Sequence, residues 1–237
     1  MNEADTAPLI EAKDLAKSFT LHARDHLRLA VLSEINLAVR GGECVVLDGP
    51  SGAGKSTLMR TLYGNYRADR GAILVREREA TIDLTCAAPR EILALRRGTM
   101  GYISQFLRVI PRVPTIEIVA EPLVALGVDR GAARDRAAAL LERLGLPERF
   151  WGLPPATFSG GEQQRVNIAR GLIARHPLLL VDEPTASLDA ANRETVIALL
   201  QEARDAGTAI IAICHDDVTR TALATRYYKI PLKVQAE

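Results

Sequence analysis

The sequence predicts an α/β protein with a parallel sheet at the centre of a three-layer core. Three runs that are apolar at successive positions, ECVVL (43–47), LLLVD (178–182) and AIIAIC (209–214), are typical of strands buried on both faces. Helical periodicity in residues 191–207 separates the last two runs. Because buried strands that alternate with helices are usually parallel and joined by crossover helices, these observations together favour a parallel sheet.

The N-terminal part of the chain predicts further strands. The runs LIEAKDLAKSF (9–19) and LRLAVLSEINLAV (27–39) precede the buried run at 43–47, and Gly41-Gly42 predicts a turn before it. We therefore expect a strand-rich N-terminal region that leads directly into the parallel sheet.

The next segments predict a helix, a strand and then a group of helices. Residues 56–64 (STLMRTLYG) are typical of a helix that ends at a glycine, and MGYIS (100–104) is typical of a short strand. Residues 115–127 and 130–146 have helical periodicity, and a group of prolines ends this region. The prolines are Pro147, Pro154 and Pro155.

This order predicts one domain, residues 1–237, with a helical lobe inserted into its core. We place the lobe at about residues 106–155 and expect a disordered tail at residues 1–8. The core is then expected to consist of about residues 9–105 and 156–237.

Composition excludes several classes of function. With 48% hydrophobic and 25% charged residues and a net charge of +1, the chain has no overall attraction to nucleic acid or to a membrane surface. The start MNEADTAP lacks the features of a signal peptide, and no run approaches the roughly 18 apolar residues of a membrane span. The scattered Cys44, Cys86 and Cys214 are typical of a reducing compartment, so we expect a cytoplasmic protein without a membrane span of its own.

A glycine-rich loop supplies the first candidate site. The stretch GPSGAGKS matches the pattern G-x-x-x-x-G-K-[ST], and it follows a buried strand and opens a helix, as that pattern requires. Its backbone N–H groups would surround phosphates, Lys55 would carry charge to the β and γ phosphates, and Ser56 would offer a hydroxyl to Mg²⁺. The site comprises Gly49, Pro50, Ser51, Gly52, Ala53, Gly54, Lys55, Ser56 and Thr57.

Polar residues at the ends of two later strands complete the predicted site for ATP and Mg²⁺. Asp182 ends LLLVD and is expected to hold Mg²⁺, and Glu183 is expected to orient or deprotonate the attacking water. His215 follows the next strand and would reach the γ phosphate from the same edge. For each of them the alternative is an ordinary strand end at the surface.

The stretch FSGGEQQR (158–165) predicts a second anion site. Ser159 and Glu162 stand in the spacing of a capping box at the start of a helix. That box does not explain Gly160 and Gly161, because glycine in a helix costs about 1 kcal/mol relative to alanine. Glycines at a helix start allow an anion to approach bare N–H groups. Since the chain already has one phosphate loop, we expect this helix to contact the nucleotide of a second copy in a twofold dimer.

Together these motifs resemble an ABC-type ATPase over essentially the whole chain. The motifs are the glycine-rich loop, Gln105 after a short strand, SGGEQQR, LLLVDEP, Ser187-Leu188-Asp189 and His215. The resemblance implies a P-loop NTPase fold with a three-layer core, an antiparallel β subdomain and an inserted helical subdomain. It also implies a head-to-tail pair, a homodimer or a dimer with a related ATPase, around two ATP molecules.

Further residue roles are implied by this resemblance alone. Gln105 would sense the γ phosphate and contact Mg²⁺, and Asp189 would communicate across the dimer interface. An N-terminal aromatic residue would stack on adenine. Phe19 is at the matching position, where a plain core role is the alternative.

The segment after Gln105 predicts a contact surface for a partner protein. Apolar residues are interleaved there with arginines in FLRVIPR (106–112), directly after Gln105. The alternative is the ordinary start of the helical lobe. The residues of this strip are Phe106, Leu107, Arg108, Val109, Ile110 and Arg112.

A finer resemblance concerns the system that this ATPase serves. RTLYGNY, YISQFLRVIPR and TFSGGEQQRVNIARG are similar to the ATP-binding L subunit of phosphonate C–P lyase systems. That similarity implies soluble C–P lyase partner subunits and support for forming ribose 1-phosphonate 5-triphosphate from phosphonate and ATP. The alternatives are the ATP-binding subunit of a lipoprotein-release or macrolide-export transporter, and a nucleotide-dependent scaffold that barely hydrolyses ATP.

Overall fold

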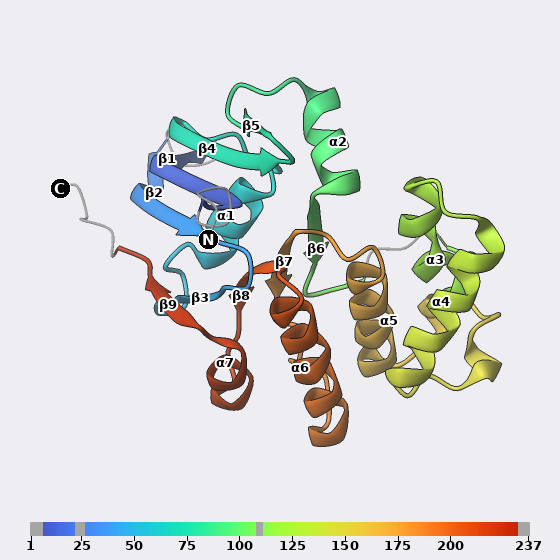
Figure 1. Ribbon diagram of the computed structural model, residues 1–237. Coiled ribbons are helices and arrows are strands. Elements are labelled where there is room, and N and C mark those ends of the chain that lie inside the picture. The colour runs from blue at the N-terminus through green and yellow to red at the C-terminus, as the bar shows by residue number, and fades with distance from the viewer. Residues whose placement is uncertain (1–6, 22–26, 108–110, 232–237) are drawn as a thin grey trace.

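The computed structural model describes residues 7–21, 27–107 and 111–231. Within them the chain forms two β-sheets with helices between and around them (Figure 1). Most of the predicted N-terminal tail lies outside the described residues, so its disorder stays a prediction, as do the boundaries assigned to the helical lobe.

The N-terminal sheet is antiparallel and has the strand order β2-β1-β4-β5. Strands β1 (Ile10–Leu21) and β2 (Leu27–Val39) correspond to the two runs that predicted strands. Strands β4 (Arg70–Glu77) and β5 (Ala80–Asp83) were not predicted. In β4 only the side chains at positions 73 and 75 are buried. The apolar alternation is therefore too short to predict a strand.

The second sheet is parallel, as predicted, with the strand order β6-β7-β8-β3-β9. Its strands include β6 (Met100–Ile103), β7 (Leu178–Asp182), β8 (Ala209–Ile213) and β3 (Cys44–Asp48). An edge strand, β9 (Arg226–Lys229), pairs with β3. Parallel pairing places the carboxyl ends of all these strands at one edge of the sheet.

The central strands are buried on both faces because each face packs against a different layer. In β3, Val45 and Leu47 face a core that includes α1 (Lys55–Leu62) and the antiparallel sheet. Cys44 and Val46 face the opposite core, which contains residues of the later helices. Burial raises the pKa of the Cys44 thiol to about 12, so it remains a protonated, apolar filler at neutral pH.

Three helices cover the second face of the parallel sheet, and two more extend from it (Figure 1). Helices α5 (Gly160–Leu172), α6 (Ala190–Asp205) and α7 (Asp217–Leu223) contribute to the core on this face. Helices α3 (Thr115–Ala125) and α4 (Arg130–Arg143) pack on each other and on α5. No helix in the described part of the chain is long and apolar enough to cross a bilayer.

The predicted helices are present, and three further elements were missed. Helix α2 (Pro89–Gly98) has a single buried residue, Leu95, and α7 is short, so neither has a strong apolar stripe. In β9 exposed and half-buried residues alternate over four positions, which is too short a pattern to predict a strand. Two 3-10 turns at positions 148–150 and 155–157 complete the region after α4.

Candidate functional site

The candidate site lies at the carboxyl edge of the parallel sheet. The glycine-rich loop follows β3, the segment with Gln105 follows β6, Asp182 ends β7, and His215 comes after β8. Sequence alone placed each group at a strand end, and the strand order places those ends side by side. Ligands of open α/β sheets bind at this edge.

The loop between β3 and α1 has the backbone of an anion cradle. Gly49, Gly52 and Gly54 all have positive φ angles, of 149°, 78° and 97°. A Cβ at Gly54 would lie 3.1 Å from the Val31 carbonyl oxygen, so only glycine fits there without a shift of the strand. Helix α1 has no side-chain cap, and its first N–H groups are therefore available to an anion.

Lys55 lies across this loop. Its ammonium group donates hydrogen bonds to the carbonyl oxygens of Gly49 at 2.6 Å and Pro50 at 3.0 Å. Ser56 is exposed in the first turn of α1. The loop therefore brings a positive charge, a hydroxyl group and unpaired N–H groups to one place, which is the combination that phosphates bind.

Asp182 is buried at the end of β7. The hydroxyl group of Tyr102 donates a hydrogen bond of 3.2 Å to its Oδ2. Burial, together with the neighbouring charge of Glu183, raises the pKa of Asp182. A bound cation would offset both effects, so this carboxylate fits a metal-side role. Sequence reasoning did not identify Tyr102, since its partner is on another strand.

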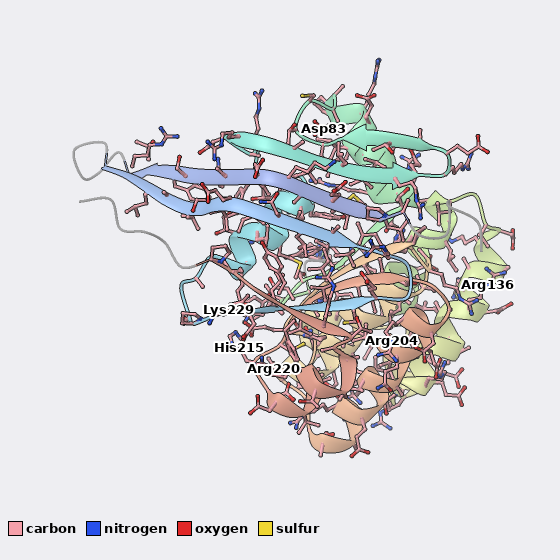
Figure 2. The ribbon with its side chains drawn as sticks, turned by 60° about the vertical axis from the view of Figure 1, so that its left-hand side comes forward. Asp83, Arg136, Arg204, His215, Arg220 and Lys229 are labelled. Carbon is pink, nitrogen blue, oxygen red and sulfur yellow. The ribbon has the colours of Figure 1, made fainter. Side chains whose placement is uncertain are left out.

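Glu183 is held between two side chains that come from two other strand ends. Gln105 donates from Nε2 to Glu183 Oε2 at 3.0 Å, and His215 Nε2 lies 2.8 Å from Oε1. The Glu183 side chain is only 19% exposed, whereas that of His215 is 59% exposed at the surface (Figure 2). Glu183 also has a φ of 51°, a left-handed conformation that is unusual for glutamate and recurs at functional sites.

Helix α5 connects this group to the SGGE stretch. Two polar side chains that point into the protein, Gln164 and Asn167, are only 4% and 5% exposed. Gln164 donates to the carbonyl oxygen of Pro184, next to Glu183, and Asn167 donates to that of Ser104, next to Gln105. Neither was predicted, because both interrupt an otherwise apolar face. They fix the helix relative to both segments that carry the candidate catalytic side chains.

The capping box at the start of α5 is present as predicted. Ser159 Oγ accepts from the Glu162 N–H at 3.4 Å, and the Ser159 N–H donates to Glu162 Oε2 at 2.8 Å. The two glycines differ. A Cβ at Gly161 would lie 2.9 Å from the Ser187 carbonyl oxygen, whereas nothing lies within 4 Å of one at Gly160. Packing within the chain thus explains why residue 161 is a glycine. It does not explain the glycine at position 160, for which a ligand or partner outside the chain is the remaining reason.

This difference gives a stability prediction. We expect Gly161→Ala to lower the free energy of unfolding by about 1–3 kcal/mol, because the added methyl group crowds a backbone oxygen. Gly160→Ala, its matched control, should change stability by no more than about 0.5 kcal/mol. Urea unfolding followed by circular dichroism measures both. Equal urea midpoints for the two variants would contradict the prediction, because the backbone at Ser187 would then move aside with little loss of stability.

Asp189 acts locally as the N-cap of α6. Its carboxylate accepts hydrogen bonds from the Asn192 N–H at 2.9 Å and from Asn192 Nδ2 at 2.7 Å. Asn192 Oδ1 in turn accepts from Arg165 at 2.8 Å, and Arg165 also donates to the Gly145 carbonyl oxygen. The contacts of Asp189 within the chain are therefore those of a helix cap, and its role across a dimer interface stays a prediction.

Phe19 lies on β1, outside the group of strand ends. Its half-buried ring packs edge-on to Tyr66, with the ring centroids 5.3 Å apart. Lys17 Nζ lies 5.1 Å from the Phe19 ring centroid, and Arg60 donates to the Tyr66 hydroxyl at 3.0 Å. The structure thus adds Tyr66 and Arg60 to the surroundings of Phe19. Whether Phe19 stacks on adenine stays a prediction.

The predicted partner strip divides into two parts. Phe106 is 71% exposed, and Arg112 is exposed as well, as a contact surface requires. Leu107, however, is half-buried and packs against the core of the later helices, so for this residue the alternative of a plain lobe residue is correct. Arg108, Val109 and Ile110 lie outside the described residues.

Comparison with known proteins decides the family. The family model described as ABC transporter matches residues 32–186, which includes the glycine-rich loop, the start of α5 and Asp182. The chain belongs to the ABC transporter family of ATPases. The ATP-binding cassette MJ0796, in a dimeric structure bound to ADP and Pi, is a structural neighbour of this ABC ATPase. Its TM-score is 0.84 with 28% identity, over 93% of this chain and 94% of the other.

Two relatives with curated names belong to a lipoprotein-releasing system and to a macrolide export protein. The lipoprotein-releasing system ATP-binding protein LolD 2 of Caulobacter vibrioides is 40% identical over 88% of this ABC ATPase and 89% of its own length. The macrolide export ATP-binding/permease protein MacB of Bordetella avium is 41% identical over 88% of this chain. The match spans only 31% of the length of MacB.

The acidic groups of this ABC ATPase fit a metal shared with a phosphate ligand. No group of three or more histidine, cysteine or acidic side chains in the described residues could hold a metal ion alone. Mg²⁺ usually binds one or two carboxylates together with substrate phosphates. Asp182, with the hydroxyl group of Ser56, is a donor set of that kind.

Proposed function

We propose that this chain is an Mg²⁺-dependent ATPase that works as a pair of cassettes. One observation carries the proposal: the loop with Lys55, the buried Asp182, and Glu183 held by Gln105 and His215 occupy neighbouring strand ends. A phosphate cradle, a metal-side carboxylate and a candidate base are the parts that hydrolysis of a nucleoside triphosphate needs.

Each part has a distinct role in this proposal. Residues 49–57 surround the phosphates with N–H groups, and Lys55 leaves its loop carbonyls to neutralise phosphate charge. Ser56, Asp182 and Gln105 would hold Mg²⁺, which would neutralise further phosphate charge. Glu183 orients or deprotonates the attacking water, and Phe19 stacks on the adenine.

The paired arrangement follows from the start of α5. Ser159, Gly160 and Glu162 lie at the N-terminus of a 13-residue helix, and the space that a Cβ of Gly160 would occupy is open. In a head-to-tail dimer this helix end, with Asp189 nearby, would face the nucleotide of the other copy. The structural neighbours support this proposal, because they are described as dimeric cassettes.

The partner class is the finer part of the proposal. The export-system relatives favour a membrane transporter, of which this chain would be the cytoplasmic ATP-binding subunit. The second candidate is the ATP-binding subunit of a C–P lyase system that forms ribose 1-phosphonate 5-triphosphate with soluble partners. Its support is the similarity of RTLYGNY, YISQFLRVIPR and TFSGGEQQRVNIARG to that subunit.

One experiment separates these candidates. Tagged Glu183→Gln protein would be purified with ATP from cells grown on a phosphonate as their only source of phosphorus, and mass spectrometry would identify its partners. An integral-membrane permease is expected for the transporter subunit. Recovery of soluble C–P lyase subunits, without a permease, would reject the transporter in favour of the second candidate.

Phe106 gives a further prediction for either partner. Since its ring is exposed beside the Gln105 segment, Phe106→Ala should leave ATP affinity unchanged but weaken partner retention about tenfold, as loss of an interface anchor does. Val218→Ala, at another exposed apolar position, on α7, is the control. Quantitative pull-down at graded salt measures the effect. Equal retention of both variants would remove Phe106 from the partner surface.

A further inference from the structure

Tyr102, whose hydroxyl group bonds to Asp182, is held in place by residues of two helices. Its half-buried ring packs against the ring of Tyr63, the C-cap residue of α1, with the centroids 4.9 Å apart. Arg96 of α2 holds Tyr63 in turn, through hydrogen bonds of 3.1 and 2.9 Å to its carbonyl oxygen. The Arg96 guanidinium carbon also lies 4.5 Å from the Tyr63 ring centroid. This packing limits the positions that the Tyr102 hydroxyl group can take.

The hydroxyl group of Tyr102 is a hydrogen-bond donor at neutral pH. Burial raises its pKa well above the ordinary value of a tyrosine, and the charge of Asp182 raises it further. Among the described residues it is the only group that donates a hydrogen bond to the Asp182 side chain, and it donates to Oδ2. The contact therefore leaves the other oxygen, Oδ1, for a cation.

Helix α1 faces the same carboxylate. Side chains alternate along β7, and position 180, on the same face as Asp182, packs in the core that includes α1. Ser56 and Arg60 are four residues apart on α1 and therefore lie on one side of the helix. Burial raises the pKa of Asp182, whereas the hydrogen bond from Tyr102 and the charge of Arg60 act in the opposite direction. A hydroxyl group and a positive charge thus approach Asp182 from one helix.

A series of contacts continues from Arg60 to Phe19. Arg60 donates from Nη1 to the Tyr66 hydroxyl at 3.0 Å, and the Tyr66 ring packs edge-on to Phe19 with the centroids 5.3 Å apart. The pKa of Arg60 is raised by its hydrogen bond with Tyr66 and further by the nearby charges of Tyr102 and Asp182. Arg60 therefore lies between the aromatic group around Phe19 and the carboxylate.

We propose that Tyr102 is a positioning residue for the metal-side carboxylate, and that Arg60 and Tyr66 connect this carboxylate to Phe19. Tyr102 holds Oδ2 of Asp182 so that Oδ1 faces the cation, as partners of metal ligands do. A shift of the Tyr66 ring on adenine binding reaches Asp182 through Arg60. This inference rests on the proposed function, because it takes Asp182 as a ligand of Mg²⁺ and Phe19 as the residue that stacks on adenine.

The test measures how much Mg²⁺ strengthens ATP binding. ATP affinity is determined by titration calorimetry with excess Mg²⁺ and again with EDTA, in Glu183→Gln protein so that hydrolysis does not interfere. The ratio of the two affinities is the Mg²⁺ advantage. Tyr102→Phe, which keeps the ring and removes the hydroxyl group, should lower the Mg²⁺ advantage about tenfold, as loss of a partner of a metal ligand does. Affinity in EDTA should stay unchanged, whereas a structural fault would lower both affinities together.

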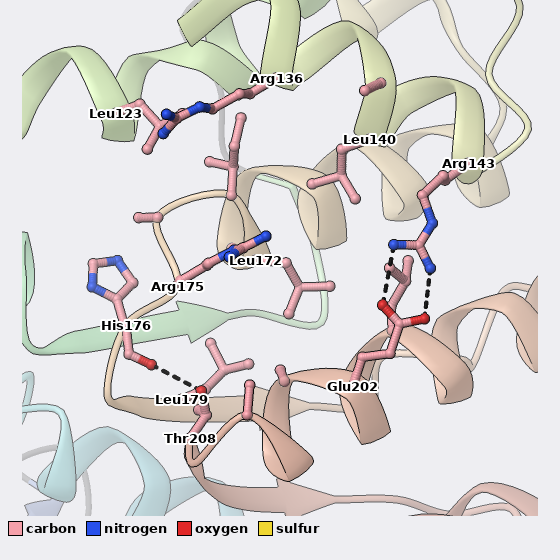
Figure 3. A pocket seen from close by; sticks show the side chains of 17 residues that line it. Leu123, Arg136, Leu140, Arg143, Leu172, Arg175, His176, Leu179, Glu202 and Thr208 are labelled. Carbon is pink, nitrogen blue, oxygen red and sulfur yellow. Dashed lines mark hydrogen bonds and ion pairs between the residues drawn. The ribbon is translucent and has the colours of Figure 1, made fainter. Parts of the chain in front are cut away.

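Two matched variants control for the loss of a hydroxyl group. Tyr63→Phe keeps the ring that packs against Tyr102. Thr208→Val removes a hydroxyl group that donates at 3.3 Å to the His176 carbonyl oxygen, beside a pocket at the amino edge of the parallel sheet (Figure 3). Both should keep the full Mg²⁺ advantage.

The outcomes separate this inference from the proposed function. An unchanged Mg²⁺ advantage in Tyr102→Phe protein, or an equal loss in the control variants, would overturn the positioning role alone. If Mg²⁺ strengthens ATP binding in none of the proteins, Glu183→Gln itself included, the metal role proposed for Asp182 is wrong, and this inference with it.

A double variant tests the connection to Phe19. Tyr66→Phe removes the oxygen atom that accepts from Arg60, and it should lower the Mg²⁺ advantage by less than Tyr102→Phe does. Because both act on Asp182 through one series of contacts, the loss in the double variant should fall short of the product of the two single losses. A loss equal to that product would show independent effects and overturn the connection.

Discussion

Replacement of Glu183 by glutamine is expected to lower ATP turnover by about 10²- to 10⁴-fold, the usual contribution of a general base. Glutamine has the same shape and can keep a contact with Gln105 or His215, but it cannot accept a proton from water. The measurement is phosphate release at saturating ATP and Mg²⁺. Near-normal turnover would exclude Glu183 as the residue that activates water.

The same variant tests the paired arrangement. Because its phosphate cradle is intact, Glu183→Gln should bind ATP normally and, without hydrolysis, accumulate as a dimer that light scattering detects. Glu79→Gln, at the exposed turn between β4 and β5, is the matched control and should resemble the unaltered protein. A Glu183→Gln protein that stays monomeric with ATP would disprove the shared-nucleotide dimer.

Replacement of Lys55 by alanine is expected to act at an earlier step. The ammonium group now bonds to two loop carbonyls, and in the proposed complex it bonds to phosphate oxygens instead. Loss of a charge-assisted hydrogen bond of about 1.5–3 kcal/mol should weaken ATP binding about 10- to 100-fold and abolish measurable turnover. Titration calorimetry with ATP measures the affinity.

The fold of this variant needs its own control. Lys55 is part of a surface loop, so the melting temperature without nucleotide should stay close to that of the unaltered protein. Lys13→Ala, which removes a surface ammonium group paired with Glu11, should change neither affinity nor turnover. Unchanged ATP affinity in Lys55→Ala protein would show that the loop cradles phosphate without this side chain.

Strands and helices with a clear local apolar pattern could be predicted one at a time from the sequence. The runs at 43–47, 178–182 and 209–214 predicted buried strands, because a strand buried on both faces is apolar at successive positions. The apolar stripe at 191–207 predicted α6, because a helix buried on one face has apolar residues every three to four positions. The elements that were missed, β4, β5, α2, α7 and β9, bury few side chains and leave little periodicity.

At the candidate site, motif spacing identified groups but not their contacts. Lys55, Asp182, Glu183 and His215 were placed at strand ends, whereas the hydrogen bond from Tyr102 to Asp182 depends on two strands far apart in sequence. The paired glycines show the same limit. Both were attributed to an anion, but Gly161 is required by the Ser187 carbonyl oxygen, a contact between separate segments.

The sequence by itself determined the class of fold, the family and the kinds of chemical group available at the site, since motif spacing and periodicity act over short distances along the chain. Only the tertiary structure decided which groups meet. The strand order β6-β7-β8-β3 brings Gln105 and His215 to Glu183. Strand order depends on pairing between distant segments, which no local pattern encodes.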